Sequence, residues 1–124
     1  MQRNVIAVVD DLFFASKIRG AVEQADARVI FARTIDAVIA ATESQRPFLF
    51  IADLHSQGCN PIQLAQRLKS HQELKGVPLV GFFSHLQVEL ARRSKEAGFD
   101  QAIPRSALTN YLGEILKAPQ TGEP

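Results

Sequence analysis

Apolar and polar residues follow two alternating patterns along the chain. Short, mainly apolar runs rich in branched and aromatic side chains occur at 5–9, 28–32, 48–52, 77–83 and 101–104. Runs of this length and character are typical of strands buried on both faces of a parallel sheet. Between them, apolar residues recur every three or four positions, which is the spacing of an amphipathic helix. The pattern therefore predicts strands that alternate with helices.

Residues with strong positional preferences mark the ends of several predicted helices. Asn60 as N-cap and Pro61 as the first helical residue begin a helix that we expect to end near Gly76. Ser84 and Gln87 have the spacing of a capping box and predict another helix that starts directly after Ser84. These signals give the helices definite boundaries that a structure can test.

Five strands alternating with five helices predict a doubly wound α/β fold, in which helices cover both faces of a five-stranded parallel sheet. At this length the flavodoxin-like strand order 2-1-3-4-5 is common. The 124 residues fit a single domain. We expect this domain to span residues 1–117, with its final helix at about 107–117, and residues 118–124 to form a flexible tail.

Acidic residues follow two of the predicted strands. Asp10 and Asp11 come after the first strand, and Asp53 ends the central strand at 48–53. In the flavodoxin-like order these two strands are neighbours, and their carboxyl ends meet at the ligand-binding edge of the sheet. Taken singly, each acid is explained more simply as a helix cap or a strand end. Taken together, the three acids favour a functional site.

Three clustered carboxylates repel one another unless a cation lies between them, and a set of oxygen ligands favours Mg²⁺. A magnesium site of this kind suits phosphoryl transfer, because the ion neutralises charge on the incoming phosphate. An aspartate at a strand end, here Asp53, can then act as the nucleophile and form an acyl phosphate.

With these motifs, the sequence resembles the receiver domain of bacterial two-component response regulators. The resemblance covers residues 4 to about 117. It rests on Asp10-Asp11 after the first strand, Asp53 after the third, Val77-Pro78 at the start of the fourth, and the Ala97-Gly98-Phe99-Asp100 sequence before the fifth. By this resemblance the expected fold is again the flavodoxin-like one.

The resemblance also implies a function and a set of site residues. Asp53 would be the phosphoacceptor, and Mg²⁺ would be held by Asp10, Asp11, Asp53 and the backbone carbonyl of His55. The expected partners are a histidine kinase or phosphotransfer protein and a downstream protein bound at the face of the fourth and fifth helices, with a homodimer as a further option. We expect no enzymatic activity beyond autocatalysis at Asp53.

Several positions depart from the family pattern. Phe83 takes the place of the switch Thr or Ser, with Ser84 one residue later. Arg105-Ser106 takes the place of the family's Lys-Pro, and Ala102 the place of its switch aromatic residue. Phe83 cannot donate a hydrogen bond to a phosphoryl group, a contact worth roughly 1.5 to 3 kcal/mol. Ser84 either substitutes for that donor or serves as a helix cap.

Arg105 keeps a positive charge near Asp53, but its planar fork favours a bidentate pair with a carboxylate. Such a pair would occupy the space that a phosphate needs. The alternative, a solvated residue at a helix start, is the weaker interpretation of Arg105. Two hypotheses follow: a phosphorylatable receiver with an altered switch, or a phosphorylation-independent pseudo-receiver that acts as a protein-interaction module.

Two further alternatives are weaker. His55, Cys59 and His85 could join Asp53 at a softer transition metal, but they lack the close spacing of typical ligand pairs. A flavodoxin-like enzyme or cofactor carrier would need a glycine-rich phosphate loop, which the sequence lacks.

Composition limits the function classes further. A net charge of +1 gives no basis for direct binding of nucleic acid or acidic membranes. The single cysteine excludes an internal disulfide and fits a reducing compartment. No stretch approaches the roughly 20 apolar residues of a membrane helix. We therefore expect a cytoplasmic protein.

Overall fold

The computed structural model describes residues 3–44, 46–84 and 87–117. Strands and helices alternate along them in the order β1 (Arg3–Val8), α1 (Leu12–Gln24), β2 (Ala27–Phe31), α2 (Ile35–Ser44), β3 (Leu49–Asp53), α3 (Pro61–Lys69), β4 (Leu79–Phe83), α4 (Val88–Ala97), β5 (Gln101–Pro104) and α5 (Leu108–Lys117). One turn of 3-10 helix, Arg105–Ala107, joins β5 to α5. The tail predicted at 118–124 lies outside the described residues.

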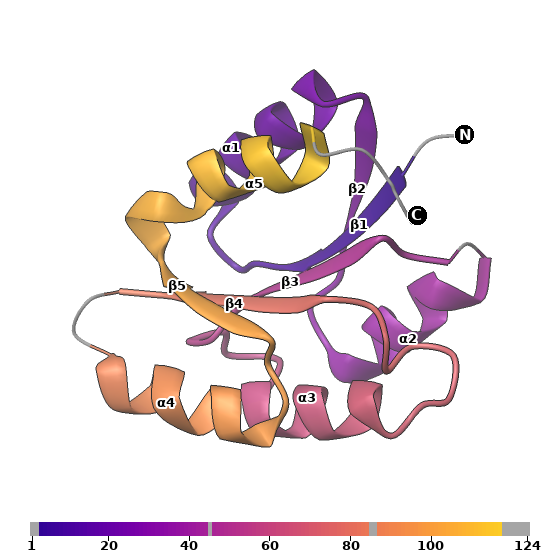
Figure 1. Ribbon diagram of the computed structural model, residues 1–124, viewed down its shortest axis with the longest axis vertical. Coiled ribbons are helices and arrows are strands. Elements are labelled where there is room, and N and C mark those ends of the chain that lie inside the picture. Colours follow the sequence, from indigo (N-terminus) through magenta and orange to yellow (C-terminus); the bar gives the residue numbers. More distant parts are fainter. Residues whose placement is uncertain (1–2, 45, 85–86, 118–124) are drawn as a thin grey trace.

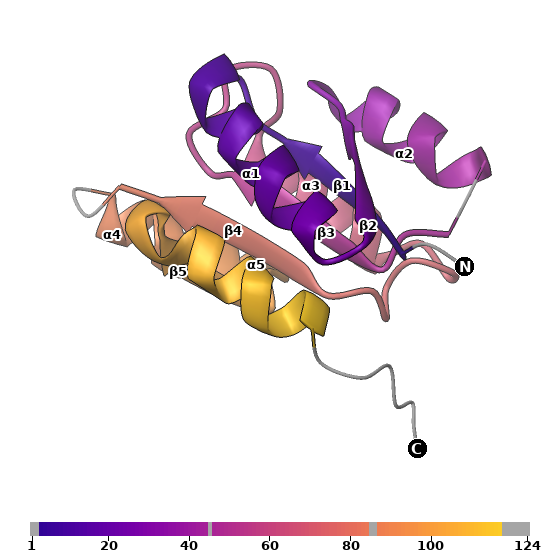
Figure 2. The ribbon, with the colours of Figure 1, turned by 90° about the horizontal axis from the view of Figure 1, so that it is seen from above.

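In the described part of the chain, five strands form one sheet in the order β2-β1-β3-β4-β5, and every pairing is parallel. The predicted doubly wound fold and its strand order are therefore confirmed. β3 is the central strand, and all five of its residues are buried. Helices α1 and α5 cover one face of the sheet, and α2, α3 and α4 cover the other (Figures 1 and 2).

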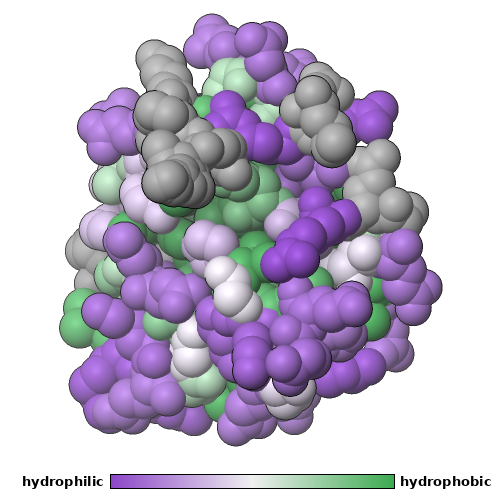
Figure 3. Space-filling view, turned by 45° about the vertical axis from the view of Figure 1, so that its right-hand side comes forward, coloured by the Kyte–Doolittle hydropathy of each residue, from purple (hydrophilic) through white to green (hydrophobic). Residues whose placement is uncertain are grey.

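Each face of the sheet buries its own apolar cluster. Ile18 of α1 and Leu112 of α5 are fully buried on one side, and Val38 of α2 and Leu64 of α3 are buried on the other. Each such side chain contributes roughly 1.5 to 3 kcal/mol on burial. Figure 3 shows hydrophilic side chains over most of the face that it presents, with hydrophobic ones between them. Among the described helices, none has the length and apolar character that crossing a membrane requires.

Helix α3 begins as predicted but ends earlier. Its N-cap Asn60 accepts a hydrogen bond from the Gln63 N–H at 3.0 Å, and Pro61 is the first helical residue. The helix ends at Lys69 rather than near Gly76, so that prediction was wrong. The Ser70 hydroxyl donates to the Arg67 carbonyl at 3.0 Å, and such local bonds compete with helix continuation.

Helix α4 begins later than predicted. Its N-cap is Gln87, and the helix starts at Val88 instead of directly after Ser84. Only half of the predicted capping box forms, because the Gln87 Oε1 accepts from the Ser84 N–H at 3.2 Å while Ser84 caps no helix. His85, one of the ligands of the soft-metal alternative, lies outside the described residues.

Candidate functional site

The sheet topology brings the three predicted acids to one edge. β1 and β3 are neighbours, with Val8 opposite Ala52. Asp10 and Asp11 therefore follow β1 at the same edge where Asp53 ends β3. Asp53 is buried, with 7% of its surface exposed, so any charge it carries must be compensated by nearby groups.

Asp11 has two roles. It is the N-cap of α1, and its Oδ1 accepts hydrogen bonds from the N–H groups of Phe13 at 2.9 Å and Phe14 at 3.3 Å. Its other oxygen, Oδ2, lies 3.8 Å from Nη1 of Arg105. The interpretation of Asp11 as a helix cap is thus confirmed, while its second oxygen faces a cation.

Asp10 is bound to the turn that follows β3. Its Oδ2 accepts from the Gln57 N–H at 2.8 Å, and the Ser56 hydroxyl lies 3.3 and 3.4 Å from its two oxygens. The same turn packs closely on its surroundings, because a Cβ added at Gly58 would lie 2.7 Å from the carbonyl oxygen of Arg33. Asp10 therefore holds the loop beside Asp53.

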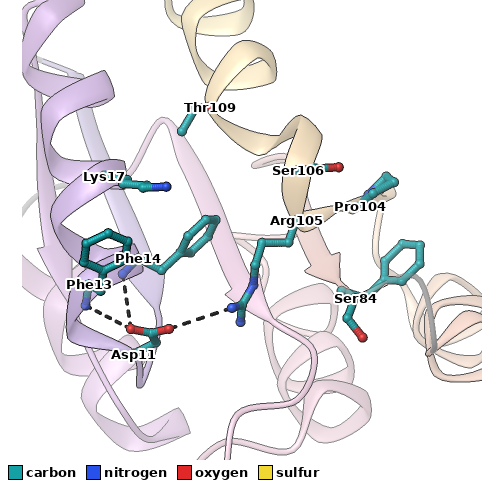
Figure 4. Close-up of a pocket in the computed structure, with 10 residues that line it drawn as sticks. Asp11, Phe13, Phe14, Lys17, Ser84, Pro104, Arg105, Ser106 and Thr109 are labelled. Carbon is teal, nitrogen blue, oxygen red and sulfur yellow. Dashed lines mark hydrogen bonds and ion pairs between the residues drawn. The ribbon is translucent and has the colours of Figure 1, made fainter.

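Arg105 joins Asp53 to Asp11. The Asp53 Oδ1 accepts from the His55 N–H at 2.9 Å, and its Oδ2 accepts from Nη2 of Arg105 at 3.4 Å. Since the other terminal nitrogen of Arg105 faces Asp11, one guanidinium serves two carboxylates (Figure 4 shows the Asp11 side). The expected bidentate pair with one carboxylate does not form here, because the two terminal nitrogens of Arg105 face different carboxylates.

Two aromatic rings hold the guanidinium in place. Its central carbon lies 4.8 Å from the ring centroid of Phe14 and 5.8 Å from that of Phe82, and the two rings are 5.0 Å apart. A guanidinium stacks on such rings more readily than an ammonium does, which explains the use of Arg here. Sequence reasoning missed both rings; the only available signal was a phenylalanine three residues after Asp11.

The three carboxylates do not form one cation pocket. Among the described residues, no group of three or more His, Cys, Asp or Glu is placed to hold a metal ion. Instead, Asp11 and Asp53 share Arg105 while Asp10 binds the neighbouring turn. The oxygens of Asp11 and Asp53 still suit Mg²⁺, which takes one or two carboxylates and several waters. In this arrangement, however, the guanidinium occupies the place of the cation.

The soft-metal alternative gains no support from Cys59. The residue is 3% exposed. Burial, and to a lesser degree the charge of Asp10, raises the pKa of the Cys59 thiol from its ordinary value of 9.0 to about 11. The thiolate is the form that ligates metals, and the raised pKa of Cys59 does not favour that form.

The predicted switch residues lie beside the site without bonding to Asp53. Phe83 is half-buried and Ser84 is exposed. The Ser84 hydroxyl lies 3.4 Å from the Gln87 Oε1, so its hydrogen bonding is local. Within the described residues the bonding partners of the Asp53 carboxylate are His55 and Arg105.

No protein-family model matches the sequence, and no curated protein matches it significantly. Solved structures do match. A putative response regulator from Chloroflexus aurantiacus superposes with a TM-score of 0.81 at 18% identity, covering 95% of this chain and 100% of that one. The phosphorylated cyanobacterial phytochrome response regulator RcpA gives a TM-score of 0.77 at 20% identity, with coverages of 94% and 90%.

A third similar structure is the receiver domain of the sensor histidine kinase PA1611 from Pseudomonas aeruginosa, which has a magnesium ion coordinated in its active-site cleft. It has a TM-score of 0.77 at 13% identity, with coverages of 95% and 100%. The chain has the receiver-domain fold. The resemblance seen in the sequence is thereby confirmed for the fold. These similarities concern the fold, so any role for Asp53 and Arg105 must be argued from the geometry of the site.

Proposed function

We propose that this receiver-fold protein is a signalling module whose Asp53 accepts a phosphoryl group from a histidine kinase or phosphotransfer protein. The observation that carries the proposal is the setting of the Asp53 carboxylate. It ends the central strand, one oxygen is fixed by the His55 N–H, and the other faces a cation. A similar structure, RcpA, is described as phosphorylated.

The chemistry would be a simple displacement. An oxygen of the Asp53 carboxylate attacks phosphorus, and the bond from phosphorus to the donor's imidazole nitrogen breaks. The donor's ring nitrogen keeps the bonding electrons, and because its other ring nitrogen carries a proton, the donor leaves as neutral imidazole while Asp53 becomes an acyl phosphate. Arg105 is close enough to stabilise the phosphoryl oxygens, but it must first release the oxygen that it now bonds.

Asp11, Asp53 and the His55 carbonyl are the groups that would hold Mg²⁺ in this site. The ion would supply further neutralisation of phosphoryl charge. Because Arg105 now lies between Asp11 and Asp53, we expect Arg105 and Mg²⁺ to compete for these carboxylates.

The test is incubation with acetyl phosphate and Mg²⁺, followed by intact-mass measurement. We expect a gain of one phosphoryl group that is lost in strong acid and in base, as an acyl phosphate is, and that Asp53→Asn abolishes. The matched control is Asp36→Asn, which changes an exposed acid on α2 and should leave the adduct unchanged. The proposal is wrong if the parent protein gains no phosphoryl group.

A second candidate function is a pseudo-receiver that works through protein contacts alone. The guanidinium between Asp11 and Asp53 favours it, as does the absence of a hydroxyl at Phe83. The parent protein and Asp53→Asn separate the two functions. A pseudo-receiver gains no phosphoryl group in either form, whereas a phosphorylatable receiver gains one that Asp53→Asn abolishes. A gain seen only in Arg105→Ala would show that Arg105 blocks the reaction.

For either function, the proposed contact with a downstream partner is the face of α4 and α5. Val88, at the start of α4, is a large apolar residue with 65% of its surface exposed. Val88→Asp should weaken partner binding without changing phosphorylation, which a pull-down with the purified partner can measure.

A further inference from the structure

A pocket of about 470 Å³ adjoins the acid site, between the start of α1 and the turn that joins β5 to α5 (Figure 4). Its volume lies within the range of about 300 to 1,000 Å³ that is usual for small-molecule sites. Arg105 lines this pocket and also bridges Asp11 and Asp53. Nothing in the proposed phosphoryl chemistry uses the pocket's other walls.

Those walls are largely aromatic and apolar. Phe13 and Phe14 line one side of the pocket, and Phe83 and Pro104 line another. Phe13 is 73% exposed although it is one of the largest apolar side chains. An exposed aromatic residue at the rim of a pocket is suited to cover a flat apolar ring.

Two cations line the pocket, and only one of them is paired. Arg105 is shared by two carboxylates, Asp11 and Asp53, so it presents no free charge to a ligand. Lys17 forms no ion pair with any carboxylate in the described part of the chain, and its ammonium lies 5.1 Å from the Phe13 ring centroid. Figure 4 shows the Lys17 side chain reaching into the space between α1 and α5, opposite Thr109. The pocket therefore offers one unpaired positive charge beside an aromatic surface.

We propose that this pocket binds a small molecule that carries a flat aromatic ring and a single carboxylate. The ring packs on Phe13 and Phe14, and the carboxylate pairs with Lys17 and accepts a hydrogen bond from Thr109. The ligand is expected to bind the unphosphorylated chain, so this proposal and the proposed phosphorylation of Asp53 can fail separately.

The test is an NMR titration of the labelled full chain with 2-naphthoate, compared with the uncharged amide of the same shape, 2-naphthamide. We expect saturable shifts at Phe13, Lys17 and Thr109 for the acid and binding roughly fivefold weaker for the amide, the worth of one partly exposed ion pair. Lys17→Gln should weaken 2-naphthoate to the same degree. The control Lys75→Gln, which changes an exposed lysine after α3, should leave its affinity unchanged.

A neighbouring groove provides a second control. It shares Lys17 and Thr109 with the pocket but is otherwise lined by residues such as Gly20 and Gly113. Gly113→Leu should fill this groove without weakening 2-naphthoate, whereas Phe13→Ala should weaken it. Three results would each overturn the proposal. They are equal affinity for 2-naphthoate and 2-naphthamide, loss of 2-naphthoate binding in Gly113→Leu, and no saturable shifts up to the solubility limit of 2-naphthoate.

Discussion

Replacing Arg105 by alanine tests the central contact of the site. The change removes the cation that Asp11 and Asp53 share. The Asp53 side chain is only 9% exposed, so its carboxylate would keep a single hydrogen bond, from His55, and little water. The Asp11 side chain is 46% exposed and would lose much less. We therefore expect the cost to come mainly from Asp53.

The size of this cost follows from burial. Removing one partner of a fully buried ion pair costs roughly 3 to 5 kcal/mol, because the other charge is left uncompensated. The Arg105 side chain is 42% exposed, so solvent already screens the pair and the cost must be reduced accordingly. Loss of the stacking on Phe14 and Phe82 adds about 0.5 to 1 kcal/mol. We expect a loss of about 2 kcal/mol in the free energy of unfolding, or roughly 5 to 10 °C in Tm.

Urea unfolding followed by far-ultraviolet circular dichroism measures this loss, since the chain has no tryptophan. The matched control is Arg92→Ala, because Arg92 also bridges two carboxylates, Glu89 and Glu96. All three are exposed on α4, so we expect a loss below about 1 kcal/mol. The reasoning is refuted if Arg105→Ala lowers the free energy of unfolding by no more than Arg92→Ala does. It is also refuted if Arg105→Ala lowers that free energy equally in the parent protein and in Asp53→Asn.

Three further predictions concern packing and titration away from this contact. Gly20→Ala and Gly113→Ala, in helices where an added Cβ meets no atom within 4 Å, should each stabilise the fold by about 0.5 to 1 kcal/mol, measured as a higher urea midpoint. Gly81→Ala should destabilise it by about 1 to 3 kcal/mol in the same assay, because its Cβ would lie 2.5 Å from a methyl carbon of Leu54. The folded Cys59 thiol, with its pKa raised to about 11, holds its proton between about pH 9 and 11 where the unfolded thiol loses it. The free energy of unfolding should therefore fall as the pH rises through that range, and it should fall by less in Cys59→Ala. Urea unfolding of both proteins at about pH 8 and about pH 10.5 measures the difference.

The fold could be predicted from the sequence because it depends on local pattern. The run at 48–52 is apolar at every position, which predicts a strand buried on both faces, and the structure buries every residue of β3. Once the central strand was known, the position of Asp53 at the carboxyl edge followed from chain direction alone. The strand order followed from the alternation of strands and helices, which few topologies satisfy.

The arrangement of the site could not be predicted in the same way, since it depends on contacts between distant residues. Arg105 and Asp53 are 52 positions apart. The spacing of apolar residues also does not indicate that the Phe14 and Phe82 rings contact the guanidinium. The acid pair suggested a pocket of three equivalent carboxylates, whereas backbone N–H groups at Phe13 and Gln57 bind Asp11 and Asp10 separately.

Arg105 also connects the acid site to the neighbouring pocket. The same guanidinium bonds Asp53 and lines the pocket. It cannot stay stacked on Phe14 and Phe82 and also move to contact a ligand. If the proposed ligand binds, we therefore expect its binding and any change that draws Arg105 away from Asp53 to alter each other's equilibrium free energy by equal amounts. The physical basis is the planar guanidinium of Arg105, which, unlike a point charge, can face two carboxylates and line the pocket at the same time.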